Sequence, residues 1–195
     1  MNATFILIIG LIIFLGAHSI RILADDWRSI MLARIGELGW KGLIAVVSLL
    51  GFGLIIWGFG MTRAEPVVLW QPPFWTRHLA ALLTLPAFVL LVAAYVPGNR
   101  IKSVIGHPMV AGVKVWALAH LLANGRLADL LLFGSFLIWA AFSFRTARRR
   151  DRATAVTYPA GPLSRTIIVV VIGIAAWAIF VMKLHGLLIG VRPFG

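Results

Sequence analysis

Six long apolar runs, each close to the length of a bilayer crossing, constrain this chain more than any other feature. A transmembrane α-helix needs about 20 consecutive apolar residues. The runs cover roughly residues 3–22, 41–61, 76–96, 108–124, 127–144 and 166–189. The alternating segments of about ten residues that indicate a β-barrel are missing. We therefore expect an all-α fold, a polytopic transmembrane helical bundle of about six spans.

The composition agrees with a membrane protein that has no separate soluble domain. Hydrophobic residues make up 61% of the 195 residues, whereas soluble domains contain roughly 45–50%. The runs leave little chain outside them, so we interpret residues 1–195 as one transmembrane domain. Residues 1–23 lack a basic segment and a small-residue cleavage site, which predicts a retained helix rather than a signal peptide.

The formal net charge of +12 reflects membrane topology rather than binding of nucleic acid. Twelve of the 18 Lys and Arg residues fall in the loops after the first, third and fifth runs. These are Arg21, Arg28, Arg34, Lys41, Arg100, Lys102, Arg145, Arg148, Arg149, Arg150, Arg152 and Arg165. Cytoplasmic loops carry the excess of basic residues. The pattern predicts a multi-pass protein with both termini on the periplasmic side and with membrane lipids as its surroundings.

Local signals predict two helix ends and one ion pair. Asn124 is suited to end the fourth helix, and Asp129 would lie in the first turn of the fifth, where the helix dipole favours an anion. The short link between them predicts a tight helical hairpin. If the first helix continues past its span, His18, Arg21, Asp25 and Arg28 share one face, and Arg21 pairs with Asp25.

The ionisable residues limit the chemistry that the chain can support. There are five histidines, six acidic residues and no cysteine. A carboxylate-rich di-iron site needs several glutamates on facing helices, and calcium or magnesium sites need oxygen ligands. Thiolate sites and covalent c-type haem are excluded. Histidine without cysteine suits zinc, copper or haem iron.

His120 is the strongest single candidate, because ionisable residues inside spans are rare and usually face a bundle interior or a cavity. Trp116 and Asn124 lie one turn to either side, on the same face, so the three would line a cofactor pocket. The alternative is a histidine that is hydrogen-bonded to another helix. Lys114 would pair with a cofactor carboxylate or extend to the interface. His18 lies at or inside the interface at the end of the first run.

Several motifs together resemble the NnrU family of bacterial membrane proteins. They are GAHS at 16–19, GHPM at 106–109, KVWALAHLLANG at 114–125, ADLLLFGSFLIW at 128–139 and LHGLLIGV at 184–191. They keep their order over almost the whole chain. The resemblance implies a role in denitrification, the respiratory reduction of nitrite and nitric oxide, at the bacterial inner membrane.

The family is related to the plastid 15-cis-ζ-carotene isomerase, a membrane enzyme with haem b. That relationship implies His18 and His120 as the iron ligands, and it places Ala117 where the isomerase has a cysteine. Helical depth alone favours His107 as the partner of His18, and His78 or His185 as the partner of His120, so His107 is the substitute ligand. Arg21 or Lys114 would pair with a haem propionate.

Three functional hypotheses follow from the residues and the resemblance. The first is a haem b protein that supports nitrite or nitric oxide reduction, with a reductase system as its partner. The second is a redox-dependent cis-trans isomerase of a carotenoid-like polyene lipid. The third is a non-enzymatic membrane assembly or transport factor whose histidines are packing elements.

Overall fold

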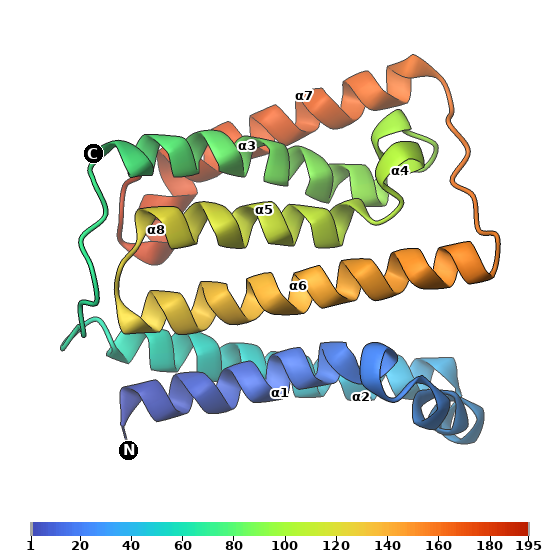
Figure 1. Ribbon diagram of the computed structural model, residues 1–195, viewed down its shortest axis with the longest axis horizontal. Coiled ribbons are helices and arrows are strands. Elements are labelled where there is room, and N and C mark those ends of the chain that lie inside the picture. Colours follow the sequence, from blue (N-terminus) through green and yellow to red (C-terminus); the bar gives the residue numbers. More distant parts are fainter. Residues whose placement is uncertain (1, 195) are drawn as a thin grey trace. The chain divides into compact units, whose positions relative to one another are not determined.

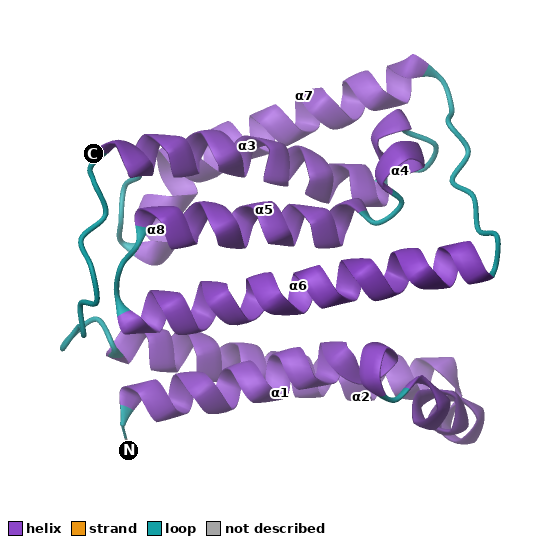
Figure 2. Ribbon diagram, viewed as in Figure 1, coloured by secondary structure: helices purple, strands orange, loops and turns teal. Residues whose placement is uncertain are grey.

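The computed structural model describes residues 2–194, and these residues are helical apart from short connections (Figures 1 and 2). The elements are α1 (Ala3–Leu23), α2 (Asp25–Met61), α3 (Trp75–Tyr95), α4 (Arg100–Ile105), α5 (Pro108–Ala123), α6 (Leu127–Ala153), α7 (Leu163–Ile179), the π-helix η1 (Phe180–Leu184) and α8 (His185–Ile189). Five helical stretches are long and apolar enough to cross a membrane, and α5 is a shorter apolar helix. The predicted all-α membrane fold is confirmed.

The chain divides into two compact units. The first contains Met1–Trp70 and Arg126–Ser135, and the second contains Gln71–Gly125 and Phe136–Gly195. Helix α6 therefore begins in the first unit and continues into the second.

In the first unit, α1 and α2 form an antiparallel pair that packs at glycines (Figure 1). A Cβ atom on Gly58 would lie 2.5 Å from the backbone nitrogen of Leu7, and one on Gly51 would lie 2.7 Å from that of Phe14. Membrane helices gain little from hydrophobic burial against one another, so their association depends on such close backbone approach.

The turn between α1 and α2 interrupts the polar face that the sequence predicted for His18, Arg21, Asp25 and Arg28. Ala24 has φ −145° and ψ 49°, which breaks the helix directly before Asp25. Asp25 therefore starts a new helix, and its carboxylate lies 3.2 Å from Nη1 of Arg28. The predicted Arg21–Asp25 pair is wrong, because i,i+4 spacing brings side chains together only on a continuous helix.

The predicted start of the fifth span is confirmed. Asp129 lies in the first turn of α6 with 1% of its surface exposed. Its carboxylate accepts hydrogen bonds from Nε of Arg126 at 2.9 Å and from the Arg126 backbone N–H at 3.2 Å. The backbone N–H of Leu127 donates to the carbonyl oxygen of Val67 at 2.9 Å, which ties the preceding loop to the helix.

In the second unit, α3 packs against both α5 and α7 (Figure 1). A Cβ atom on Gly173 of α7 would lie 2.7 Å from Cα of Val89 in α3. The indole N–H of Trp177 donates to the carbonyl oxygen of Ala81 at 3.0 Å and lies 3.2 Å from the hydroxyl of Thr84. This interhelical bond satisfies a polar atom that lipid would leave without a partner.

The predicted fourth and fifth spans are present as α5 and α6, but they meet through side chains and lack the close backbone packing of a tight hairpin. Asn124 is the C-cap of α5, as expected, with an extended backbone. Trp116 contacts Phe136, with ring centroids 5.6 Å apart, and Lys114 contacts Phe144 farther along α6. The earlier residue of α5 contacts the later residue of α6, so the two helices are antiparallel.

The loop expected after residue 144 is shorter than its sequence suggests, because α6 continues to Ala153. The remaining loop joins the connection that precedes α4. The backbone N–H of Gly161 donates to the carbonyl oxygen of Gly98 at 2.8 Å, and that of Arg100 donates to Oγ1 of Thr166 at 3.0 Å. The loops after the third and fifth spans, two of the three that the basic residues predict to be cytoplasmic, therefore meet at one end of this unit.

We predict that Gly58→Ala lowers the free energy of unfolding by about 1–3 kcal/mol, because the new methyl group must push α1 away. Reversible unfolding in mixed micelles measures the change. Gly53→Ala in the same helix is the matched control, since its methyl group meets nothing within 4 Å. Equal losses in both variants would contradict the role of close packing.

Candidate functional site

His120 lies near the end of α5 with two of the residues that the sequence placed beside it. Its Nδ1 is 2.8 Å from the carbonyl oxygen of Trp116, and the two rings are 5.2 Å apart. The side-chain amide of Asn124 donates to the carbonyl oxygen of His120 at 2.8 Å. Trp116 and Asn124 therefore lie beside His120, one turn before it and one turn after it, as the spacing predicted.

The carbonyl contact decides which nitrogen of His120 carries the proton. A carbonyl oxygen only accepts hydrogen bonds, so Nδ1 must donate, and the lone pair of a neutral ring lies on Nε2. Metal-bound histidines commonly use this arrangement, in which the second nitrogen donates to a carbonyl and fixes the tautomer. His120 is therefore held in a form that can ligate a metal.

His18 near the end of α1 has the same local geometry. Its Nδ1 lies 2.7 Å from the carbonyl oxygen of Phe14. The Phe14 ring stacks on the imidazole, with centroids 4.4 Å apart and an interplanar angle of 27°. The lone pair of neutral His18 is again on Nε2. His18 belongs to the first unit and His120 to the second.

These donors fit haem iron better than a metal ion held only by side chains. Among residues 2–194, no three or more His, Cys, Asp or Glu side chains gather as a metal-ion site. Haem iron needs only one or two axial ligands from the protein, because the porphyrin supplies the other four. His18 and His120, taken separately, each have an aromatic ring beside the imidazole and the tautomer with its lone pair on Nε2, so each is a candidate for that role.

The two predicted partners for a cofactor carboxylate have different surroundings. Lys114 is partly buried on α5, and its Nζ lies 5.1 Å from the centroid of the Phe144 ring, within the range of a cation–π contact. Arg21 is exposed in the last turn of α1. Lys114 is therefore positioned by a neighbouring helix, whereas Arg21 extends from the helix end.

His107 lies in a polar network that the sequence did not indicate. Its Nε2 is 2.9 Å from Oδ2 of Asp151, and the hydroxyl of Tyr158 donates to the same oxygen at 3.2 Å. The side chains of His107 and Asp151 are 24% and 14% exposed. The network joins the start of α5 to the end of α6 and to the following loop. Because Nε2 of His107 is hydrogen-bonded to the Asp151 carboxylate, His18 and His120 remain the preferred candidates for iron ligands.

Burial raises the pKa of the Tyr158 phenol above its ordinary value, and the Asp151 carboxylate raises it further by charge and by the hydrogen bond. The guanidinium groups of Arg148 and Arg150 act in the opposite direction. Sequence analysis missed both Asp151 and Tyr158. The available signal was the single acidic residue among six arginines in residues 145–165.

The other two histidines lie in the second unit. The ring of His78 in α3 lies between the rings of Phe74 and Phe194, with centroid distances of 5.3 and 6.2 Å. Nδ1 of His185 is 2.6 Å from the carbonyl oxygen of Val191. His185 thus shares the tautomer of His18 and His120, while contacts of His78 are with aromatic rings.

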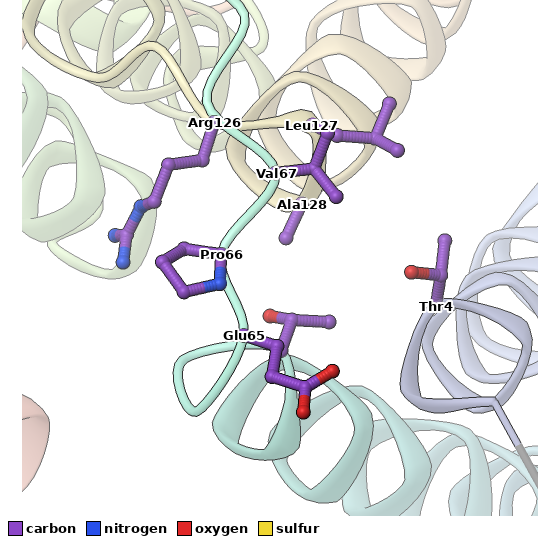
Figure 3. Close-up of a pocket in the computed structure, with 8 residues that line it drawn as sticks. Thr4, Glu65, Pro66, Val67, Arg126, Leu127 and Ala128 are labelled. Carbon is purple, nitrogen blue, oxygen red and sulfur yellow. The ribbon is translucent and has the colours of Figure 1, made fainter.

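A small cavity in the first unit lies between the ends of α1 and α2 and the start of α6 (Figure 3). Its volume is about 20 Å³, which is room for about one water molecule. Figure 3 shows the guanidinium group of Arg126 directed away from Thr4. This cavity is too small for a cofactor.

The long apolar helices define an all-α membrane protein. The chain belongs to the NnrU family. The family model, whose description is NnrU protein, matches residues 6–193. No curated protein and no solved structure matches the chain. The resemblance seen in the sequence motifs is confirmed at the level of the family.

We predict that the phenol of Tyr158 titrates above the ordinary tyrosine pKa and that Asp151→Asn lowers its midpoint, because the variant removes a negative charge and a carboxylate acceptor. The measurement is phenolate absorbance against pH in a Tyr95→Phe background, where Tyr158 is the only tyrosine. Tyr158→Phe in that background sets the baseline. An unchanged midpoint after Asp151→Asn would contradict the assigned interaction.

Proposed function

We propose that this protein binds haem b between its helices and supports the reduction of nitrite or nitric oxide in denitrifying bacteria. The observation that carries the proposal is the matching geometry of His18 and His120, whose Nδ1 atoms each donate to the carbonyl oxygen four residues earlier. Membership of the NnrU family, together with the role in denitrification that the resemblance implies, supports the respiratory part of the proposal.

In this proposal, His18 and His120 would each supply a nitrogen ligand to haem iron, and Trp116 would form part of the pocket wall beside His120. Haem supplies one-electron chemistry and an iron centre that can interact with diatomic ligands. The carbonyl bonds at Nδ1 hold each imidazole ring in orientation. Lys114 or Arg21 would balance the charge of a propionate, and Asn124 holds the last turn of α5.

The polyene isomerase remains the alternative activity. Ala117 is fully buried in α5 and has no sulfur with which to ligate iron. A mechanism that exchanges an iron ligand with a thiol at this position is therefore unavailable to this chain. Incubation of the purified protein with a cis-polyene and a reductant tests this activity separately from nitrite or nitric oxide reduction.

We also propose that the loops around Gly98 and Gly161 lie in the cytoplasm and that both termini are periplasmic. The basic residues of these loops support this orientation. Alkaline phosphatase fused after Gly195 should be active, and the same enzyme inserted after Ala155 should be inactive. Green fluorescent protein at the same two positions should give the reciprocal result. The reverse pattern would overturn the orientation.

The haem proposal predicts a Soret band in the protein purified in mild detergent, and loss of that band in both His18→Ala and His120→Ala. Each variant removes one nitrogen ligand of the iron. Reduced-minus-oxidised spectra and haem quantification measure the effect. His78→Ala is the matched control, because the His78 ring contacts the rings of Phe74 and Phe194, and this variant should keep the band.

The pattern of losses also identifies errors in the ligand assignment. Loss in only one of the two variants moves the second ligand to His107, His78 or His185. No Soret band in the wild-type protein, even after haem reconstitution, would overturn haem binding and favour an assembly or transport role.

A further inference from the structure

The end of the second unit formed by residues 96–107 and 148–166, here called the basic end, concentrates positive charge. These two segments carry seven basic residues and a single acidic one, Asp151. The basic residues are Arg100, Lys102, Arg148, Arg149, Arg150, Arg152 and Arg165. Bonds between the segments, such as that from Gly161 to Gly98, hold these charges together.

A cavity of about 250 Å³ lies within the basic end. Its lining comes from both segments and consists of Pro97, Gly98, Asn99, Lys102, Ser103, Tyr158 and Pro159. Since one water molecule occupies about 30 Å³ in the liquid, this cavity has room for a group much larger than water. Its polar side chains include an ammonium group, an amide and two hydroxyl groups.

Arg148 and Tyr158 approach each other over Gly106. A Cβ atom on Gly106 would lie 3.0 Å from Nη1 of Arg148 and 3.1 Å from the ring of Tyr158. The φ of Gly106 is 75°, a left-handed conformation that favours glycine. The backbone at this position thus leaves space for a guanidinium group beside the tyrosine that lines the cavity.

Arg150 supplies the observation that points to a ligand. Its Nη1 atom is buried and has no hydrogen-bond partner among residues 2–194. The nearest carboxylate in the sequence, Asp151, already accepts hydrogen bonds from His107 and Tyr158 on one oxygen. A buried donor without an acceptor is unfavourable. Arg150 also lies close enough to Tyr158 to lower the pKa of its phenol.

We propose that the basic end binds a phosphate group, with Arg150 and Arg148 as the principal donors and Lys102 at the cavity wall. Phosphate oxygens are strong acceptors for guanidinium groups and would satisfy the buried Nη1 atom. Either a phospholipid headgroup or free phosphate offers this chemistry. The anionic surface of the cytoplasmic leaflet would bring lipid headgroups to loops with this charge. The proposal is independent of haem binding.

The test titrates the full-length protein in phosphatidylcholine nanodiscs and follows thermal unfolding by tryptophan fluorescence. One arm replaces part of the lipid with phosphatidylglycerol, and the other adds inorganic phosphate against chloride of equal ionic strength. We expect a saturable rise in Tm in at least one arm. A response to phosphatidylglycerol alone identifies a lipid site, and a response to phosphate identifies a soluble anion. No response in either arm would overturn the proposal.

Arg150→Gln should weaken the responding anion at least about tenfold, the loss expected for one charge-assisted hydrogen bond. Arg152→Gln is the matched control, because Arg152 has the same charge two residues away and is exposed. Equal effects of the two variants would show that the anion is held only by general electrostatic attraction, and this result would overturn the proposed site.

Native mass spectrometry of the wild-type protein adds a measurement that does not depend on the variants folding. After limited delipidation, a lipid site predicts one phosphatidylglycerol retained in preference to phosphatidylcholine. A soluble-anion site predicts one bound phosphate. Equal retention of both lipids together with no bound phosphate contradicts the proposal.

Discussion

The hydrogen-bonding needs of the backbone in a bilayer govern this structure. Water is absent from the hydrocarbon core, so each N–H and C=O group must find its partner inside the protein, and helices provide those partners within one segment. Lipid is as apolar as the side chains, so burial alone cannot hold two helices together. Close contact takes its place at Gly58 against Leu7 and at Gly173 against Val89.

The same requirement acts on the polar side chains of the helices. Ser19 and Thr84 donate to carbonyl oxygens one turn earlier, at 2.6 and 2.8 Å, and His18 and His120 use Nδ1 in the same way. For a hydroxyl group, this bond only offsets the free-energy cost of placing a polar group among apolar surroundings. For an imidazole it also places the lone pair on Nε2. A local solution to burying a polar ring therefore prepares the nitrogen that a metal would need.

The basic end of the second unit follows different physics, because it is built from loops and helix ends. Here charges are numerous, and the network of His107, Asp151 and Tyr158 links three separate segments. Asp151 is the single carboxylate of these segments and accepts from His107 and Tyr158, while the buried Nη1 of Arg150 has no hydrogen-bond partner among residues 2–194. The proposed haem ligands in the spans and the proposed phosphate site at the basic end would therefore be separate sites with different ligands.

The sequence by itself determined the apolar helices and the local caps, but not every limit, because α2 begins at Asp25 rather than near residue 41 and α6 ends at Ala153 rather than near residue 144. Apolar length is a property of consecutive residues, and the capping positions of Asn124 and Asp129 depend on neighbours within one turn. The grouping of Trp116, His120 and Asn124 was predictable for the same reason. The Arg21–Asp25 pair was not, because a single non-helical residue, Ala24, interrupts the spacing.

Only the tertiary structure decided which residues meet across the chain. His107 and Asp151 are 44 positions apart, and the contact of Gly173 with Val89 depends on how two helices are rotated and aligned. In a membrane helix, the face toward lipid and the face toward another helix are both apolar, so the sequence pattern leaves that rotation undefined. Close packing and interhelical hydrogen bonds select it, and these contacts exist only once the helices have assembled.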